Sequence, residues 1–203
     1  MYGRLSPTQI DVIKEVSTIG SANAATALSG LINQNIGITV PQVSLVPIEN
    51  ISKLLGGMEN LYFVLDTELK GDISGRIFLL FSPEDARFLG SILLGCNKED
   101  IDFNDDMFQS SLKESANILG GSYLTAMAEM TNLTILNSTP SLAMDMVGAI
   151  LDFIFIQIAQ YSEEVLFIKT ELTVRDQNMG GLLFLFPSVE SLRKIFEVLD
   201  IKE

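Results

Sequence analysis

The first long amphipathic pattern begins at Ser6-Pro7, which supplies a helix N-cap followed by a proline at the first helical position. Apolar positions then recur at helical spacing as far as about Ile32: Ile10, Ile13, Ile19 and the alanines after Ala22. A second such pattern follows the capping residues Asn104-Asp105-Asp106 and extends to about Met130, with Met107, Leu112, Ile118 and Leu119 in its stripe. The sequence therefore predicts two long amphipathic helices.

Elsewhere the apolar pattern changes to alternating or β-branched runs, which are typical of strands. These runs are found at Ile36–Val40, Val43–Ile48, Leu61–Leu69, Gly75–Phe81, Val165–Val174 and Gly181–Phe186. Gly71-Asp72 predicts a tight turn between two antiparallel strands, and we interpret Asn178-Met179-Gly180 as its counterpart. A shorter helix is expected after each strand pair, at Pro83–Leu94 and Val189–Leu199.

The chain repeats itself at an offset of 99 residues, which aligns Asp11–Pro41 with Ser110–Pro140 without a gap. Eight residues are identical in the two segments: Lys14, Glu15, Ile19, Thr26, Ala27, Asn33, Ile36 and Pro41 match Lys113, Glu114, Ile118, Thr125, Ala126, Asn132, Ile135 and Pro140. Similarity continues downstream, where Thr67-Glu68-Leu69 matches Thr170-Glu171-Leu172. The duplication therefore spans nearly the whole chain.

A period of about 100 residues is too long for a solenoid and indicates two similar halves. We expect a single domain, residues 1–203, made of two repeats of about 1–98 and 99–203 that are related by a pseudo-two-fold axis. Each repeat is predicted to contain a helix, then strands, then a helix. This order indicates the α+β class, with helices on a largely antiparallel sheet in a two-layer sandwich.

Composition narrows the functions that the chain can have. Acidic residues outnumber basic ones by 26 to 13, and the net charge of −13 would repel nucleic acid. Histidine is absent and Cys96 stands alone, which excludes Ser–His and Cys–His catalysis and leaves no good zinc ligand set. Any chemistry must come from carboxylates, amides and hydroxyls, and we expect no metal site.

The expected location is the cytoplasm. The N-terminus lacks the basic start and apolar run of a signal peptide, and a single cysteine cannot form an internal disulfide. The longest apolar run, Met146–Ile158, is interrupted by Asp152 and is shorter than the roughly 20 residues that cross a bilayer. We interpret it as a buried helix and expect no membrane insertion.

Three polar residues share one face of the second predicted long helix. Ser110, Glu114 and Asn117 are spaced i, i+4, i+7, so they project in the same direction. The opposite face, which includes Leu112, would contact the core and leave the polar face to solvent or to a partner. Gly121 follows on the same helix, and its small size would let another chain approach closely.

Glu-x-x-Asn is common on amphipathic helices, so Glu114 and Asn117 have a simple alternative explanation as surface polar residues. The wider pattern favours a site, because the same face recurs in the first repeat and a proline follows its third member by 23 positions in both copies. These residues are Asp11, Glu15, Thr18 and Pro41 in the first repeat, with Pro140 in the second.

With these residues the chain resembles the CheC, CheX and FliY family of chemotaxis phosphatases, whose signature is Asp or Ser, three residues, Glu, two residues, Asn, then 22 residues and Pro. The length and twofold layout are similar to those of CheC, and Gly20–Ala27 and Val40–Pro47 also look like its N-terminal half. The resemblance covers essentially the whole chain. FliY itself is disfavoured, because the chain ends at Glu203, directly after the last expected helix.

The resemblance implies hydrolysis of the aspartyl phosphate on CheY, the response regulator that sets flagellar rotation. Asn117 would place its amide beside the phosphoryl group and orient the attacking water, and Glu114 would contact a lysine of the receiver. Ser110, Asp11 and Gly121 are expected to be partner-binding residues. The chain is expected to need no cofactor of its own, because the Mg²⁺ would lie in the receiver's acidic pocket.

The first copy departs from the family pattern, because Thr18 stands where the asparagine is expected. A hydroxyl is shorter than an amide and cannot donate and accept from two separate atoms. We therefore predict that the first site is weak or inactive. Two interpretations stay open for its acidic residues: Glu15 assists docking, or Asp11 and Glu15 persist only as solvated helix surface.

The remaining candidates are weaker. Asn23 is interpreted as a helix-packing or hydrogen-bonding residue, and Cys96 is expected to be inert. The acidic group lacks the glycine and terminal glutamate of a calcium loop and is interpreted as a solvated, helix-capping linker: Asp100, Asp102, Asp105 and Asp106. Met144, Met146 and Phe153–Phe155 are interpreted as core or as part of an apolar partner surface.

The principal rival hypothesis is a non-enzymatic role. In that case the protein would bind and regulate CheD, the receptor deamidase that CheC proteins partner, or would act at the flagellar switch. Loss of the asparagine from one motif is consistent with this rival, because the duplicated fold then persists without full catalysis.

Overall fold

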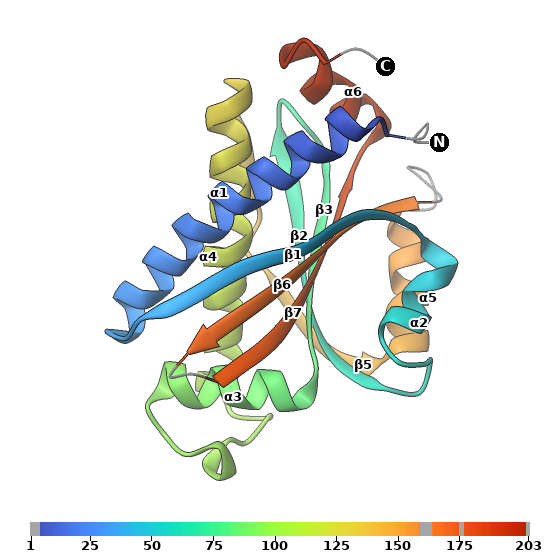
Figure 1. The fold of residues 1–203 in the computed structure, drawn as a ribbon. Helices are drawn as coiled ribbons and strands as arrows, with labels where there is room; N and C mark the ends of the chain where they lie inside the picture. Colours follow the sequence, from blue (N-terminus) through green and yellow to red (C-terminus); the bar gives the residue numbers. More distant parts are fainter. Residues whose placement is uncertain (1–4, 159–163, 175–176, 202–203) are drawn as a thin grey trace.

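The computed structural model describes residues 5–158, 164–174 and 177–201. In chain order these form α1 (Pro7–Ile32), β1 (Ile36–Pro47), α2 (Ile51–Leu54), β2 (Leu61–Gly71), β3 (Gly75–Phe81), α3 (Pro83–Leu94), α4 (Asp106–Thr131), β4 (Ile135–Asn137), β5 (Ser141–Met146), α5 (Val147–Ile158), β6 (Glu164–Val174), β7 (Gln177–Pro187) and α6 (Val189–Val198), with short 3-10 turns at Ile48–Asn50 and Lys98–Asp100. Figure 1 shows a curled sheet with α1 and α4 on one face and α2 and α5 on the other.

The two long helices begin and end where the sequence predicts, because their ends carry strong capping residues. Ser6 and Gln9 form a capping box at the start of α1, and Asp105 caps α4. Asn33 and Asn132, which match in the repeat alignment, end the helices in the left-handed conformation, with φ of 52° and 54°. The internal repeat is therefore visible in the helix caps.

The strands form one antiparallel sheet in the order β1-β6-β7-β3-β2-β4, and β5 also pairs with β2. At its centre β3 pairs with β7, the equivalent strand of the other repeat. The strands that follow each long helix cross over, because β1 pairs with β6 while β4 and β5 pair with β2. The order is unchanged when the repeats are exchanged, as a pseudo-two-fold axis requires. A single domain stays a prediction, which this interleaving favours.

The α1 and α4 helices cross at a close contact. A Cβ atom on Gly20 would lie 2.8 Å from Tyr123 Cα, so only glycine fits there. Beside it, Ser21 Oγ donates to Ser17 O and accepts a hydrogen bond of 2.8 Å from the Tyr123 hydroxyl. Tyr123 also bonds Thr170 on β6 at 3.4 Å, and burial raises the pKa of its hydroxyl. The crossing thus joins both repeats.

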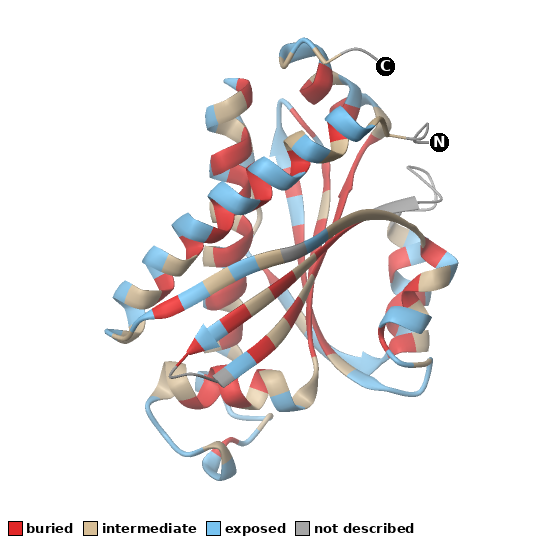
Figure 2. Ribbon diagram, viewed as in Figure 1, coloured by how far each residue is buried: buried red, intermediate tan, exposed pale blue. Residues whose placement is uncertain are grey.

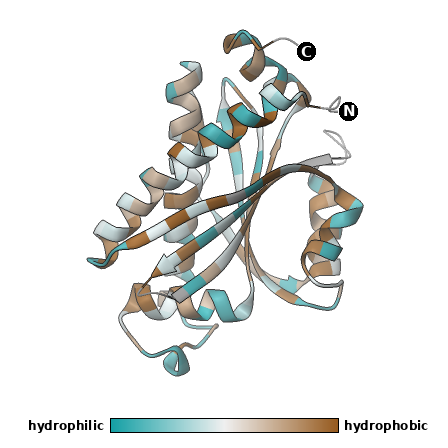
Figure 3. Cartoon of the chain, viewed as in Figure 1, coloured by the Kyte–Doolittle hydropathy of each residue, from teal (hydrophilic) through white to brown (hydrophobic). Residues whose placement is uncertain are grey.

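Apolar residues cover both faces of the sheet. In β2, Phe63 and Leu65 belong to the core beneath the long helices, whereas Val64 belongs to a smaller core beneath α2 and α5. Figure 2 shows buried residues along the inward sides of α1 and α4, and Figure 3 shows the apolar character of the strands between the layers. The predicted α+β class and antiparallel sheet are confirmed, and α2 and α5 add a smaller layer on the second face.

A proline interrupts the strand region after each long helix. The two strands expected in the first repeat form one continuous strand, β1, whose pairing with β6 shifts register between Thr39 and Gln42, beside Pro41. In the second repeat the interruption separates β4 from β5, and Pro140 directly precedes β5. Because proline has no N–H for the strand ladder, these positions explain both irregularities.

The turn predicted at Asn178-Met179-Gly180 is wrong. These residues lie inside β7 and pair with Thr173, Leu172 and Glu171 of β6. The Gly180 N–H also donates to Asp85 Oδ1 at 3.1 Å, so this glycine lies where β7 meets α3. β6 ends at Val174 and β7 begins at Gln177, and residues 175–176 lie outside the described residues.

Several apolar residues are more exposed than predicted. The helix expected at Met146–Ile158 begins at Val147, and only one of its sides is buried, through residues that include Ile150 and Ile154. Other side chains from β5 and α5 are 41% to 76% exposed: Met144, Met146, Phe153, Phe155 and Ile156. The core interpretation of the first four is therefore wrong. Met107 and Ile19, which were assigned to the helical stripes, are also exposed.

Candidate functional site

Ser110, Glu114 and Asn117 are exposed along the same side of α4, as their spacing predicts. Leu112 and Ala116, on the opposite side, are buried. The same helix therefore contacts the core with one face and presents a hydroxyl, a carboxylate and an amide with the other.

The Asn117 amide is joined to the edge of the sheet. Asn137, the last residue of β4, donates from its Nδ2 to Asn117 Oδ1 at 2.9 Å. A carbonyl oxygen has two lone pairs, so Asn117 Oδ1 can accept a second hydrogen bond. Within the described part of the chain, Asn117 Nδ2 makes no hydrogen bond. The amide can therefore still accept one hydrogen bond and donate two.

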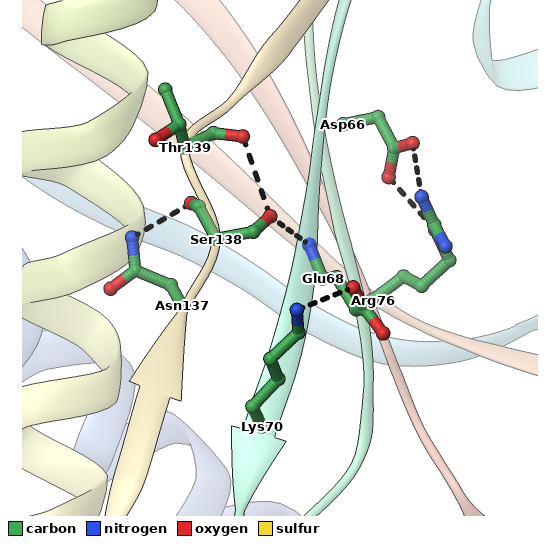
Figure 4. Close-up of polar contacts among 7 residues, drawn as sticks. All are labelled: Asp66, Glu68, Lys70, Arg76, Asn137, Ser138 and Thr139. Atoms are coloured by element: carbon green, nitrogen blue, oxygen red, sulfur yellow. Dashed lines mark hydrogen bonds and ion pairs between the residues drawn. The ribbon is translucent and has the colours of Figure 1, made fainter.

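The strand edge beside α4 is held by polar contacts (Figure 4). The Ser138 N–H donates to Glu68 O at 2.9 Å, and the Glu68 N–H donates to Ser138 Oγ at 3.0 Å. On β2 and β3, Arg76 binds Asp66 through two hydrogen bonds of 2.9 and 2.5 Å. The Ser138–Glu68 contacts extend the β2–β4 pairing beyond Asn137. The Arg76–Asp66 contact joins β2 to its other neighbour, β3.

The equivalent face of α1 differs in its chemistry. Asp11, Glu15 and Thr18 are all exposed, so the face is repeated. Thr18 Oγ1 donates to the Lys14 carbonyl at 2.8 Å, which directs the only hydroxyl hydrogen into its own helix. The residue that aligns with Asn137 is Ile38, whose side chain cannot form a hydrogen bond.

The other sequence candidates are placed as follows. Gly121 is partly exposed, and the position of an added Cβ is open space. Asn23 is exposed on α1, so its interpretation as a helix-packing residue is wrong. The acidic segment is an exposed linker in which Asp105 caps α4 by accepting the Met107 N–H at 3.0 Å, and this interpretation is confirmed. Cys96 is an exposed free thiol.

No three or more Asp, Glu, Cys or His side chains in residues 5–158, 164–174 and 177–201 come together in a way that would hold a metal ion. Over the same residues, no helix combines the length and the apolar character needed to span a membrane.

Sequence reasoning missed Asn137. Its contact with Asn117 depends on the packing of β4 beside α4, which the helical spacing of the motif does not reveal. The repeat alignment contains a usable signal, because a polar asparagine stands at a strand position that is isoleucine in the other copy.

Known proteins are similar to this chain in both regions that carry a copy of the motif. The model of the CheC-like family matches residues 9–45 and 107–144, which contain most of α1 and α4 and the strands that follow them. A Bacillus subtilis (strain 168) protein named CheY-P phosphatase CheC is 29% identical over 203 residues, which represent 98% of this chain and 97% of that protein.

Solved structures share the fold. Thermotoga maritima FliY superposes with a TM-score of 0.78 at 21% identity and covers 99% of this chain and 100% of its own. The structure of a CheX–CheY–BeF₃–Mg²⁺ complex from Borrelia burgdorferi gives a TM-score of 0.51 at 16% identity, over 83% of this chain and 96% of the matched one. The fold is thus shared with FliY and CheX, and both motif regions match the CheC-like family model. The chain is therefore similar to the CheC-like family in both motif regions and, over nearly its whole length, to a Bacillus protein that is named a CheY-P phosphatase.

Proposed function

We propose that this protein hydrolyses the aspartyl phosphate of a CheY-like response regulator through the polar face of α4. The observation that carries the proposal is the exposed Asn117 amide, which lies in the family's motif and is held against β4 by a hydrogen bond. The name of the Bacillus relative supports the reaction, and the CheX–CheY complex supports the kind of partner.

The chemistry requires little more than a positioned water. The water oxygen bonds to phosphorus while the acyl P–O bond breaks, which releases inorganic phosphate and returns the receiver's aspartate as a carboxylate. An acyl phosphate is already reactive, so holding water in line with the breaking bond supplies much of the acceleration. An amide suits this role because it can donate and accept without adding a charge that repels phosphoryl oxygens.

The other residues of the face would bind the receiver. Glu114, exposed one turn before Asn117, would contact a lysine of the receiver, and Ser110 would add a polar contact. The open space at Gly121 would let the receiver backbone come close to α4. The required Mg²⁺ would be bound by the receiver, so the proposed reaction needs no ligands from this chain.

We assign the first site little or no catalytic capacity. The Thr18 hydroxyl bonds its own helix, and α1 offers no amide at this position. Asp11 and Glu15 keep an acidic, exposed surface that can contribute to docking or serve only as solvated helix surface.

Loss of acyl phosphate from a purified, phosphorylated receiver tests the proposal directly. The protein alone should make this loss faster than the intrinsic rate in Mg²⁺ buffer. The rate should increase with protein concentration and then reach a plateau. An unchanged rate, with or without added CheD, would exclude phosphatase activity towards that receiver.

The exposed apolar surface of β5 and α5 favours a second candidate function. Its side chains include Met146, Phe153 and Ile156, and exposed apolar groups of this kind are typical of protein interaction sites. In this alternative the protein would bind a partner such as CheD without catalysis. Calorimetric titration with CheD, using Phe153→Ser and Ile156→Ser as surface variants, tests it. Binding that the variants weaken, combined with no phosphatase activity, would favour the binding role.

A further inference from the structure

A residue outside the family's motif holds the proposed catalytic amide. Asn137 Nδ2 donates to Asn117 Oδ1 at 2.9 Å and also to the Ser138 carbonyl at 3.3 Å. Both hydrogens of its NH₂ group are therefore used. Turning the Asn137 amide over would replace these donors with an oxygen that faces two carbonyl oxygens, so its orientation is fixed.

The strand that carries Asn137 is itself well anchored. Asn137 pairs with Leu69 in the β2–β4 register, and the next residue, Ser138, exchanges two hydrogen bonds with the Glu68 backbone. Asn137 thus projects from a hydrogen-bonded strand edge. In Figure 4 its side chain lies beside the ribbon of α4.

This anchor constrains the exposed asparagine on the helix. Because Asn137 supplies a donor, Asn117 must turn its Oδ1 towards β4, which directs its NH₂ group away from the strand. An exposed asparagine without a partner would populate several rotamers and both amide orientations. Fixing one orientation before the receiver binds removes that cost from the reaction.

The two repeats provide an internal comparison. The second repeat has asparagine at both positions, 117 and 137, whereas the first has Thr18 and Ile38. Thr18 bonds its own helix, so it needs no anchor from the strand. The strand asparagine thus occurs in the repeat that has an amide on the helix.

We infer that Asn137 is a positioning residue for phosphoryl hydrolysis, which orients the Asn117 amide without touching the phosphoryl group. The inference rests on the proposed function for its kinetic consequence. The orientation of Asn117 can also be measured in the free protein.

Asn137→Ala and the nearly isosteric Asn137→Asp test the inference in the phospho-receiver assay. Alanine removes the donor, and an aspartate carboxylate only accepts hydrogen bonds. Both variants should lower kcat by about 3- to 10-fold, the change expected when one hydrogen bond that holds the reacting geometry is lost. KM, and the Kd for a receiver activated with beryllium fluoride, should stay within about twofold because docking does not involve Asn137.

Leu136→Ala is the matched control, because Leu136 is the exposed preceding residue of β4 and bears no polar group. It should leave kcat unchanged. Thermal unfolding of all the variants identifies any that fail to fold. The aspartate variant, which keeps the shape of asparagine, then supplies the result if the alanine variant is unstable.

The side-chain amide of Asn117 gives a readout that does not depend on activity. In NMR relaxation measurements, its NH₂ signals should become more mobile in Asn137→Ala while the backbone of α4 keeps its order. Full kcat in both variants, or losses confined to KM, would overturn the inference and leave the proposed function standing. If Asn117→Ala itself retains full activity, the site assignment and the inference both fail.

Discussion

At the residue scale, the difference between the repeats reduces to two pairs of side chains. The second repeat pairs the amide of Asn117 with the amide of Asn137 across 2.9 Å. The first repeat has the Thr18 hydroxyl bonded to its own helix, with Ile38 at the strand position. Only the arrangement in the second repeat leaves an exposed group, the Asn117 amide, that can both donate and accept hydrogen bonds.

The charge of Glu114 gives the first residue-scale prediction. Glu114→Gln should raise KM for the phospho-receiver by about 3- to 10-fold with little change in kcat, because a charged docking contact is lost while the Asn117 amide remains. KM of the unaltered protein should rise with salt concentration, and this dependence should weaken in the variant.

Glu129→Gln is the control, because Glu129 is also exposed on α4 but lies outside the motif. Steady-state kinetics at low and high salt make the comparison. Equal effects of the two substitutions would show that only the net charge of the helix matters and that Glu114 has no specific contact.

The spacing of the motif was sufficient to predict its exposed face, because the i, i+4, i+7 geometry of a helix depends on local structure alone. Glu114 and Asn117 could be identified in this way. Asn137 could not, because its role arises from contact between α4 and a strand 20 residues further along the chain. The catalytic roles themselves stay predictions.

At the element scale, the crossing of α1 and α4 sets the relative position of the two candidate faces. The helices approach closely at Gly20 and Tyr123, where the Ser21–Tyr123 hydrogen bond is buried. Since Tyr123 follows Asn117 on the same helix, this contact fixes the part of α4 that presents the motif.

Gly20→Ala should therefore lower the free energy of unfolding by about 1–3 kcal/mol, because the new Cβ would lie 2.8 Å from Tyr123 Cα. Gly30→Ala, where nothing lies within 4 Å of an added Cβ, should instead raise it by up to about 1 kcal/mol through better helix propensity. Urea titrations followed by circular dichroism compare the two variants. A Gly20→Ala protein as stable as the original would refute the close crossing.

Elements with strong local signals were predicted well. Ser6 and Asp105 mark the starts of the long helices, and Gly71-Asp72 marks the hairpin between β2 and β3. The short strands β4 and β5 were missed because they depend on pairing with β2, which lies far away in the sequence. The false turn at residues 178–180 shows that asparagine and glycine also occur within a paired strand.

At the scale of the whole molecule, the repeats are interleaved. Each supplies the strand that extends the other's hairpin, and their central strands β3 and β7 pair directly. Strand order could not be deduced from the sequence, because the repeat alone does not distinguish two adjacent sheets from one shared sheet. The interleaving fixes α1 and α4 as equivalent helices on one face.

This equivalence leads to the central claim, which is that two similar helices share a scaffold and only α4 is chemically competent. The rate of acyl phosphate loss from a CheY-like receiver, measured in parallel for Asn117→Ala and Thr18→Ala, tests it most directly. The substitution in α4 should return the rate to the receiver's intrinsic value, and that in α1 should leave the acceleration nearly unchanged. Full activity in Asn117→Ala, or an equal loss in Thr18→Ala, would contradict the account.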